Sequence, residues 1–319
     1  MPLRPASRLA ATAAAVLSLA AASLPAQAAT YSGLYVFGDS LSDTGRVFAL
    51  TGTPSAPYAN GRYSNGAVSV EYLAQGLGIG LTSYAWGGAT TGQFNLNAGL
   101  NAVKATGVQA QVAEFAAATG GTADPNGLYF VWAGPNDFFP LLANPATTPL
   151  QLQQAAQTAI GNLVGTVSAL YGMGARQFLL PLMPDLGLTV SATKANAVVP
   201  GTAAALSQFS AGFNAGLAGG YGQLAGLLAG ETMSVVDTSA LLQASLGQFA
   251  AGSSASCLDM GAFPSCSGYL FFDDVHPTTA AHRLLAQSFS NAVPEPSGWM
   301  LGGLALLAAG AATRRRSRG

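Results

Sequence analysis

Five short apolar runs constrain the fold of this chain more than any other feature of its sequence. They are rich in aromatic and β-branched residues, and most are continuous rather than alternating, which is typical of parallel strands covered by helices on both faces. The runs occupy residues 33–37, 81–86, 128–133, 176–182 and 233–237. Helix-like segments alternate with them and occupy residues 65–78, 108–119, 149–174, 205–230 and 278–293. This alternation predicts an α/β fold, a three-layer α/β/α sandwich around a doubly wound parallel sheet of about five strands.

The N-terminal end has the pattern of an export signal. Arg4 and Arg8 precede a short apolar run at 9–24, and residues 26–28 read Ala-Gln-Ala, which has small residues at the spacing of a signal-peptidase site. A buried N-terminal helix is the alternative, but no polar face accompanies the apolar run. We therefore expect a signal peptide over 1–28, its removal by signal peptidase, and export of the mature chain across the inner membrane.

The C-terminal end joins a Pro-Glu-Pro motif, an apolar stretch at 299–312 and four arginines. The apolar stretch is shorter than the roughly 20 residues that span a bilayer comfortably, and the arginines would hold the end on the cytoplasmic side. Residues 294–319 resemble the PEP-CTERM sorting signal. The resemblance implies a short transmembrane stretch, cutting by an exosortase in the cell envelope, and a final location at the outer surface or outside the cell. An ordinary C-terminal membrane anchor is the alternative, but it leaves the Pro-Glu-Pro motif unexplained.

Between these two signals, residues 29–293 are expected to form one domain. Their length of about 265 residues is enough for a single α/β domain with a full core, and no internal repeat divides it. They carry six basic and twelve acidic side chains, a net charge of −6. This negative balance excludes the electrostatic footprint of a nucleic-acid-binding domain.

Cys257 and Cys266 are the only cysteines of the chain. An even pair this close together in an exported protein predicts a disulfide. Two metal ligands are the alternative, but no further cysteine or histidine lies near enough in the sequence to complete such a site.

Polar side chains and glycines follow three of the predicted strands. Ser40 comes after the first strand, the pair Gly87 and Gly88 after the second, and Asn136 after the third. Ligands of open parallel sheets bind at the carboxyl ends of the strands, so we expect these residues to share one rim. A serine hydroxyl at that rim becomes an effective nucleophile only when a base takes its proton.

The chain offers only two histidines as that base. His276 lies in a turn before the last predicted helix, which Pro277 begins. Asp273 stands three residues earlier and is placed to accept the Nδ1 hydrogen of His276 while Nε2 faces a serine. His282 lies inside the last predicted helix and is expected to be an ordinary helix residue, at the surface or partly buried.

In chain order, the blocks FGDSLSDTG, SYAWGGATT, GPND and DDVH resemble those of the SGNH, or GDSL, hydrolase family. The resemblance extends over residues 33–293 and implies a flavodoxin-like sheet. It implies Ser40 as the nucleophile and His276 and Asp273 as the other members of a catalytic triad. It also implies an oxyanion hole made by the backbone N–H groups of Ser40 and Gly88 and by the side chain of Asn136.

Some details of the match depart from the family pattern or stay open. Ser83 begins the second block, where the family often has asparagine. The oxyanion glycine is Gly88 by alignment, with its neighbour Gly87 as the alternative. Asp274 adjoins the expected triad acid but has the wrong spacing, and Asp39 is expected to anchor the turn. The Gly-x-Ser-x-Ser turn itself differs from the Gly-x-Ser-x-Gly elbow of α/β-hydrolases.

These residues predict an exported esterase or lipase that cleaves a carboxylic ester of short to medium acyl chain through an acyl-enzyme, with a lipid or sugar ester as substrate. No cofactor and no metal are expected, because two histidines and one carboxylate cluster make a poor metal site. Several aromatic side chains near the blocks are candidates for an acyl groove, with core packing as the alternative. They are Tyr58, Tyr63, Trp86, Phe94, Phe138 and Phe139.

Two other functions stay open at this stage. One is a deacetylase that acts on O-acetylated extracellular polysaccharide. The other is a non-enzymatic surface or matrix protein on the same fold, because PEP-CTERM signals also sort proteins that are not enzymes, and a fold does not by itself give a function.

Overall fold

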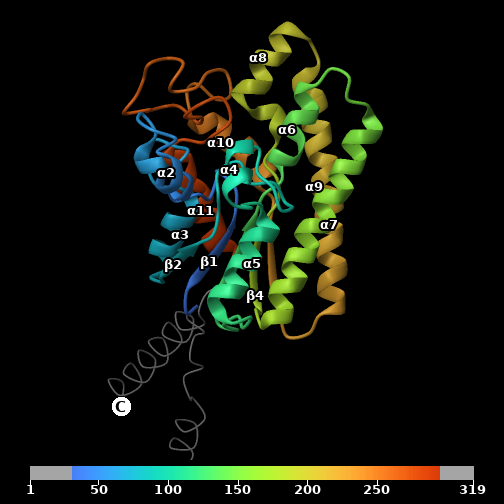
Figure 1. The fold of residues 1–319 in the computed structure, drawn as a ribbon. Coiled ribbons are helices and arrows are strands. Elements are labelled where there is room, and N and C mark those ends of the chain that lie inside the picture. The colour runs from blue at the N-terminus through green and yellow to red at the C-terminus, as the bar shows by residue number, and fades with distance from the viewer. Residues whose placement is uncertain (1–30, 295–319) are drawn as a thin grey trace, which may run out of the picture. The chain divides into compact units, whose positions relative to one another are not determined.

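The computed structural model describes residues 31–294 (Figure 1). Five parallel strands form one sheet in the order β2-β1-β3-β4-β5. The strands are β1 (Leu34–Gly38), β2 (Leu81–Ser83), β3 (Leu128–Trp132), β4 (Gln177–Pro181) and β5 (Thr232–Val236). The chain winds outward from β1 in both directions, so the strand order reverses between β1 and β3. This arrangement confirms the predicted doubly wound parallel sheet.

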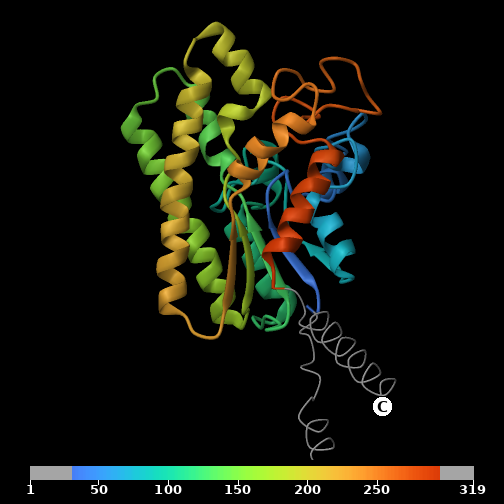
Figure 2. The same ribbon diagram turned by 180° about the vertical axis from the view of Figure 1, so that it is seen from behind.

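Long helices cover both faces of the sheet (Figures 1 and 2). On one face lie α3 (Ser69–Leu77) and α11 (Thr279–Ala292), which pack against each other. On the other face lie α5 (Val108–Thr119), α7 (Pro149–Met173) and α9 (Thr202–Leu227). All five were predicted from the sequence, and their observed bounds agree within one residue except that α3 begins four residues later and both ends of α9 lie three residues earlier than predicted.

The strands bury side chains on both faces, which explains why their sequences are continuous apolar runs. One core contains aromatic side chains that face α5, α7 and α9, namely Phe37, Tyr129 and Phe178. The second core contains side chains that face α3 and α11, namely Val36, Phe130 and Leu179. All six are at most 1% exposed, and burial of each such side chain contributes about 1.5–3 kcal/mol to folding.

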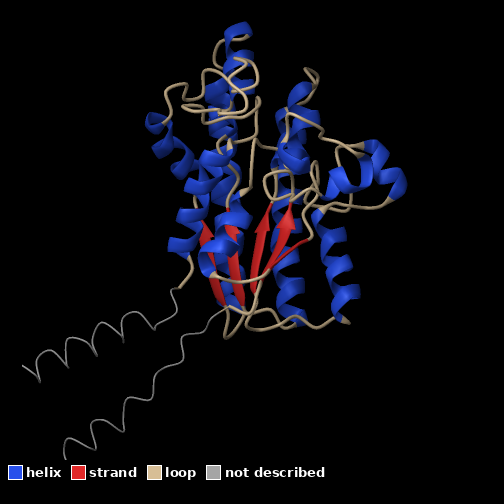
Figure 3. Ribbon diagram, turned by 90° about the vertical axis from the view of Figure 1, so that its left-hand side faces the viewer, coloured by secondary structure: helices blue, strands red, loops and turns tan. Residues whose placement is uncertain are grey.

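A short helix follows each strand and was not predicted. These helices are α2 (Arg46–Thr51), α4 (Ala98–Val103), α6 (Pro135–Ala143), α8 (Val190–Val198) and α10 (Thr238–Ser245). Short 3₁₀ turns complete the connections at η1 (Ala59–Gly61), η2 (Leu186–Leu188) and η3 (Leu246–Gln248). Figure 3 shows that helices and long loops gather beyond the carboxyl ends of the strands, which is the end that carries Ser40 and Asn136.

Cys257 and Cys266 are joined in a disulfide with a Cα–Cα distance of 5.2 Å. Both cysteines are buried against Phe272, the residue before Asp273. The Cys257 N–H also donates to the Phe271 carbonyl at 2.9 Å. The disulfide therefore stabilises the segment that leads into the loop of Asp273 and His276.

The predicted signal peptide over residues 1–28 lies outside the described residues, and so does the predicted PEP-CTERM segment from residue 295 onward. Within residues 31–294, no helix combines the length and the apolar character that crossing a bilayer requires.

Candidate active site

Ser40 lies in a tight turn directly after β1, at the point where the strand order reverses. The turn is held by Asp39, whose carboxylate accepts the Leu41 N–H at 3.0 Å and whose carbonyl accepts the Ser42 N–H at 3.1 Å. Burial raises the pKa of Asp39 to about 7, although the Leu41 hydrogen bond and the charge of His276 act in the opposite direction. Asp39 thus has the anchoring position that the sequence predicted for it.

The structure brings Ser40, His276 and Asp273 together. His276 Nε2 lies 2.8 Å from Ser40 Oγ, and His276 Nδ1 lies 2.7 Å from Asp273 Oδ2. Asp273 Oδ1 accepts the backbone N–H groups of Val275 at 2.9 Å and of His276 at 2.7 Å. Burial alone would raise the pKa of Asp273, but the adjacent His276 and these hydrogen bonds outweigh it and lower the pKa to about 2. Asp273 is therefore a carboxylate across the whole neutral range.

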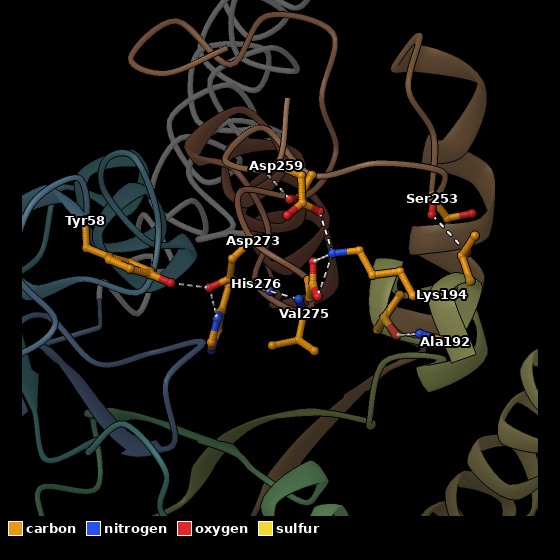
Figure 4. A network of polar contacts seen from close by, with 12 residues as sticks. Tyr58, Ala192, Lys194, Ser253, Asp259, Asp273, Val275 and His276 are labelled. Atoms are coloured by element: carbon orange, nitrogen blue, oxygen red, sulfur yellow. Dashed lines mark hydrogen bonds and ion pairs between the residues drawn. The ribbon is translucent and has the colours of Figure 1, made fainter. Parts of the chain in front are cut away.

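Two tyrosines complete the surroundings of the histidine and its carboxylate. The Tyr58 hydroxyl donates to Asp273 Oδ2 at 2.8 Å (Figure 4). The Tyr58 ring packs edge-on against Phe272. Burial, together with the nearby Asp273 charge, raises the pKa of Tyr58 above its usual range, so the phenol stays protonated and donates. The Tyr63 ring lies 5.1 Å from the His276 imidazole, centroid to centroid. Both tyrosines were candidates for an acyl groove, with core packing as the alternative, and the structure places them beside His276 and Asp273.

The two glycines after β2 differ in what their N–H groups do. The Gly87 N–H donates to Asp43 Oδ2 at 2.8 Å. The N–H groups of Gly88 and Ser40 donate to no atom within residues 31–294. Gly88 has a φ of +78°, and a Cβ there would lie 2.5 Å from Asn95 Oδ1, so only glycine fits. Of the two candidates, Gly88 is therefore the one with a free donor.

Asn136 lies in the first turn of α6 and is buried. One hydrogen of its side-chain amide is donated to the Ala89 carbonyl at 2.9 Å, which orients the amide toward the loop that contains Gly88. A second hydrogen of that amide has no partner within the described part of the chain. Within residues 31–294, two backbone N–H groups and one amide hydrogen are thus without an acceptor, and Asn136 lines the same cavity as Ser40.

Two carboxylates, the buried Asp43 and the partly buried Asp137, hold the Gly88 loop in place, and the sequence did not reveal this role. Asp43 binds the N–H groups of Gly87 and of Arg46, the latter at 2.6 Å, and so joins the serine loop to the glycine loop. Asp137 accepts the N–H of Thr91 at 2.9 Å and its hydroxyl at 2.8 Å. Burial raises the pKa of both carboxyls, and the hydrogen bonds from these backbone groups act against it. The loop that contains the candidate oxyanion donor Gly88 is therefore held by polar contacts with Asp43 and Asp137.

Ser83, which stands where the family often has asparagine, still makes a contact between these loops. Its hydroxyl lies 3.3 Å from the Ser42 carbonyl and 3.3 Å from the Ala85 N–H. His282 lies apart from the site and is completely buried in α11, so the prediction of a surface or partly buried residue was wrong. The face of α11 that carries His282 packs on α3, where the Ser69 N–H donates to Nδ1 at 3.2 Å.

A cavity of about 60 Å³ opens beside Ser40 and His276. Its wall is mostly apolar and includes Leu41, Trp132 and Phe139. Of the six aromatic residues that were candidates for an acyl groove, Phe139 is the one that lines this cavity. Trp86 lies under the Arg46 guanidinium, Phe94 is 67% exposed, and Phe138 is buried in the core. Within residues 31–294, no group of three histidine, cysteine or acidic side chains is arranged to hold a metal ion.

The family profile described as GDSL-like Lipase/Acylhydrolase matches residues 34–289, most of the chain. The chain belongs to this family. It is 30% identical over 297 residues to an acetylesterase of Thermothelomyces thermophilus, which covers 86% of this chain and 92% of that protein. It is 37% identical over 173 residues to Lipase 1 of Photorhabdus luminescens, which covers 50% of this chain. The matched region is only 23% of the length of Lipase 1.

Among solved structures, this GDSL-family chain is similar to the crystal structure of the lipase Lip_vut3 from a goat rumen metagenome. The two share 13% sequence identity with a TM-score of 0.49, and the match covers 82% of this chain and 96% of the other.

Proposed function

We propose that this GDSL-family protein is an exported serine hydrolase that cleaves carboxylic esters through Ser40, His276 and Asp273. The observation that carries the proposal is the unbroken hydrogen-bond series from Ser40 Oγ to His276 Nε2 at 2.8 Å and from His276 Nδ1 to Asp273 Oδ2 at 2.7 Å. This is the relation between nucleophile, base and orienting acid that acyl transfer to a serine requires.

In the first half of the reaction, Ser40 Oγ attacks the ester carbonyl carbon while His276 Nε2 takes the serine proton. Asp273 holds the imidazole in the tautomer that carries hydrogen on Nδ1 and stabilises the imidazolium as it forms. The carbonyl oxygen, now negative, is received by the free N–H groups of Ser40 and Gly88 and by the Asn136 amide. Each such donor lowers the barrier by about 3–4 kcal/mol.

The tetrahedral intermediate then collapses. The bond to the alcohol oxygen breaks, His276 returns its proton to that oxygen, and the acyl group stays on Ser40. In the second half, water attacks the acyl-enzyme carbonyl, His276 takes a proton from the water and returns it to Ser40 Oγ, and the carboxylic acid leaves. The triad is thereby restored, and no step requires a cofactor.

A serine-specific test uses the full chain, exported so that the disulfide can form, and a series of p-nitrophenyl esters. Ser40→Ala is expected to reduce hydrolysis to the uncatalysed background. Ser42→Ala is the matched control, because the Ser42 hydroxyl is completely buried two residues away and has no partner in the described structure. A fluorophosphonate probe should label Ser40 in the wild type, as read by peptide mass spectrometry. A Ser40→Ala variant as active as Ser42→Ala would refute the proposal.

Export and processing form a separate part of the proposal and are supported by the sequence pattern at both ends. Mass spectrometry of the protein recovered from the native cell should find an N-terminus near Ala29 and a C-terminus upstream of the four arginines. An intact C-terminal end in the membrane fraction would instead indicate an ordinary anchor. A folded wild type that hydrolyses no ester would favour the non-enzymatic surface protein.

A further inference from the structure

A second and larger cavity, of about 700 Å³, lies among α6, α8 and α9. It shares four wall residues with the small cavity beside Ser40, namely Phe139, Leu186, Thr189 and Val275. Because these side chains line both spaces, the large cavity adjoins the small one that Ser40 and His276 line.

The wall of the large cavity contains no charged side chain. Leu142, Leu206 and Phe209 contribute much of its apolar surface. The Thr189 hydroxyl is already used, because it donates to the Leu186 carbonyl at 2.8 Å and accepts the Ala192 N–H at 3.1 Å. A polar occupant such as a sugar would find few partners here, whereas burial of an apolar chain is favourable in proportion to its area.

One wall of the cavity is formed by α8, which contacts the loop that contains Asp273 and His276 (Figure 4). Lys194 of α8 bridges Asp259 at 2.6 Å and Asp274 at 2.7 Å. The Ser191 N–H donates to the Asp274 carbonyl at 3.0 Å, and the Thr193 hydroxyl donates to the Ser253 carbonyl at 3.0 Å. These contacts hold the cavity wall in a fixed position relative to His276.

We propose that the cavity among α6, α8 and α9 receives the acyl chain of the substrate, so that the enzyme prefers esters with acyl chains well beyond acetyl. This inference rests on the proposed ester hydrolysis at Ser40. The acyl part of the substrate is assigned to this cavity because the acyl carbonyl must lie at Ser40, in the small cavity that the large one adjoins. A chain that enters the cavity gains buried area with each added methylene group.

The magnitude of the preference follows from that burial. Each methylene buried in the transition state is expected to raise kcat/KM by about fourfold until the chain fills the cavity. The wild-type profile should therefore rise steeply from acetyl through butyryl to octanoyl esters, and then level off.

Substitutions at the cavity wall test this directly. Ala205 on α9 and Ala195 on α8 line the cavity and are exposed, so a tryptophan at either position fills the groove without entering the core. Ala204→Trp is the matched control, because Ala204 is an exposed neighbour on α9 that does not line the cavity. The assay is kcat/KM for acetyl, butyryl, octanoyl and dodecanoyl p-nitrophenyl esters, below the concentration at which they aggregate. Melting temperatures report whether each variant folds.

Ala205→Trp and Ala195→Trp are expected to lose at least tenfold in kcat/KM for octanoyl and dodecanoyl esters while keeping the wild-type rate for the acetyl ester. Ala204→Trp should keep the wild-type profile. Ser40-dependent hydrolysis with a profile that peaks at acetyl would overturn the acyl-site inference and leave the proposed function standing. So would folded cavity variants with unchanged profiles. An absence of hydrolysis for every ester would instead refute the proposed function itself.

Discussion

The buried histidine of α11 is expected to make the protein less stable in mild acid. His282 is 0% exposed, and its Nδ1 accepts the Ser69 N–H at 3.2 Å. Protonation of Nδ1 would break that hydrogen bond and leave a positive charge in an apolar interior. Burial, with a smaller effect from His276, accordingly lowers the pKa of His282 from 6.5 to about 3.

The size of the effect follows from the two pKa values of His282. Because the folded pKa lies below the unfolded one, the unfolded chain binds more protons in the window between them. The contribution of a neutral His282 is fully present above pH 6.5 and is lost as the pH falls toward 3. Linkage gives a loss in the free energy of unfolding of about 1 kcal/mol by pH 5.5 and about 3 kcal/mol by pH 4.5, relative to pH 7.5.

Other groups titrate in the same range, so the measurement must isolate His282. Asp39 acts in the opposite direction, because its pKa is raised to about 7, and its contribution is lost as the pH rises through that value. Urea unfolding of the wild type and of His282→Gln at several pH values isolates the histidine, since the glutamine can still accept the Ser69 N–H. The free energy of unfolding of the wild type minus that of His282→Gln should fall by about 3 kcal/mol from pH 7.5 to pH 4.5. Two parallel curves would refute this account of His282.

Two further predictions concern the surroundings of the triad. Tyr58→Phe removes the hydroxyl that donates to Asp273 at 2.8 Å. Because a hydrogen bond to a charged group contributes about 1.5–3 kcal/mol, kcat for a short ester should fall about tenfold or more. An unchanged kcat in the folded variant would exclude a positioning role for Tyr58. The double variant Cys257→Ser with Cys266→Ser removes a disulfide that joins residues nine positions apart. Its free energy of unfolding, measured in urea, should be lower by about 2–3 kcal/mol. Equal stability of the wild type and the double variant would contradict the chain-entropy argument.

The features that the sequence predicted best are those that depend on local pattern. The continuous apolar runs predicted the five strands, because strands buried on both faces leave no position for a polar side chain. The positions of Ser40 and Asn136 after two of those runs predicted a common rim, and the spacing of Asp273 and His276 predicted their contact. Each of these predictions needed only a few neighbouring residues and a general rule of parallel sheets.

The rest depended on contacts between distant and irregular segments. Tyr58 reaches Asp273 from 215 residues away, out of a loop with no periodicity, and nothing in its own neighbourhood indicates that contact. The short helix α8 has polar and apolar residues on most sides, so its sequence does not indicate which face lines a cavity. Its position in the structure involves ion pairs of Lys194 with the distant Asp259 and Asp274. Candidates for an acyl groove were sought among aromatic residues, whereas leucine and alanine side chains make up much of the wall of the cavity proposed to receive the acyl chain.

The distance along the chain between the nucleophile and its base has a consequence for how the protein is made. Ser40 and His276 are 236 residues apart, and the loop of His276 lies immediately before α11, the last helix of residues 31–294. Ser40 directly follows β1, and the other four strands of the sheet lie between Ser40 and His276 along the chain. The candidate triad is complete only when the loop of His276 contacts the loop of Ser40, so a chain that ended before residue 273 would contain the serine without its base and acid.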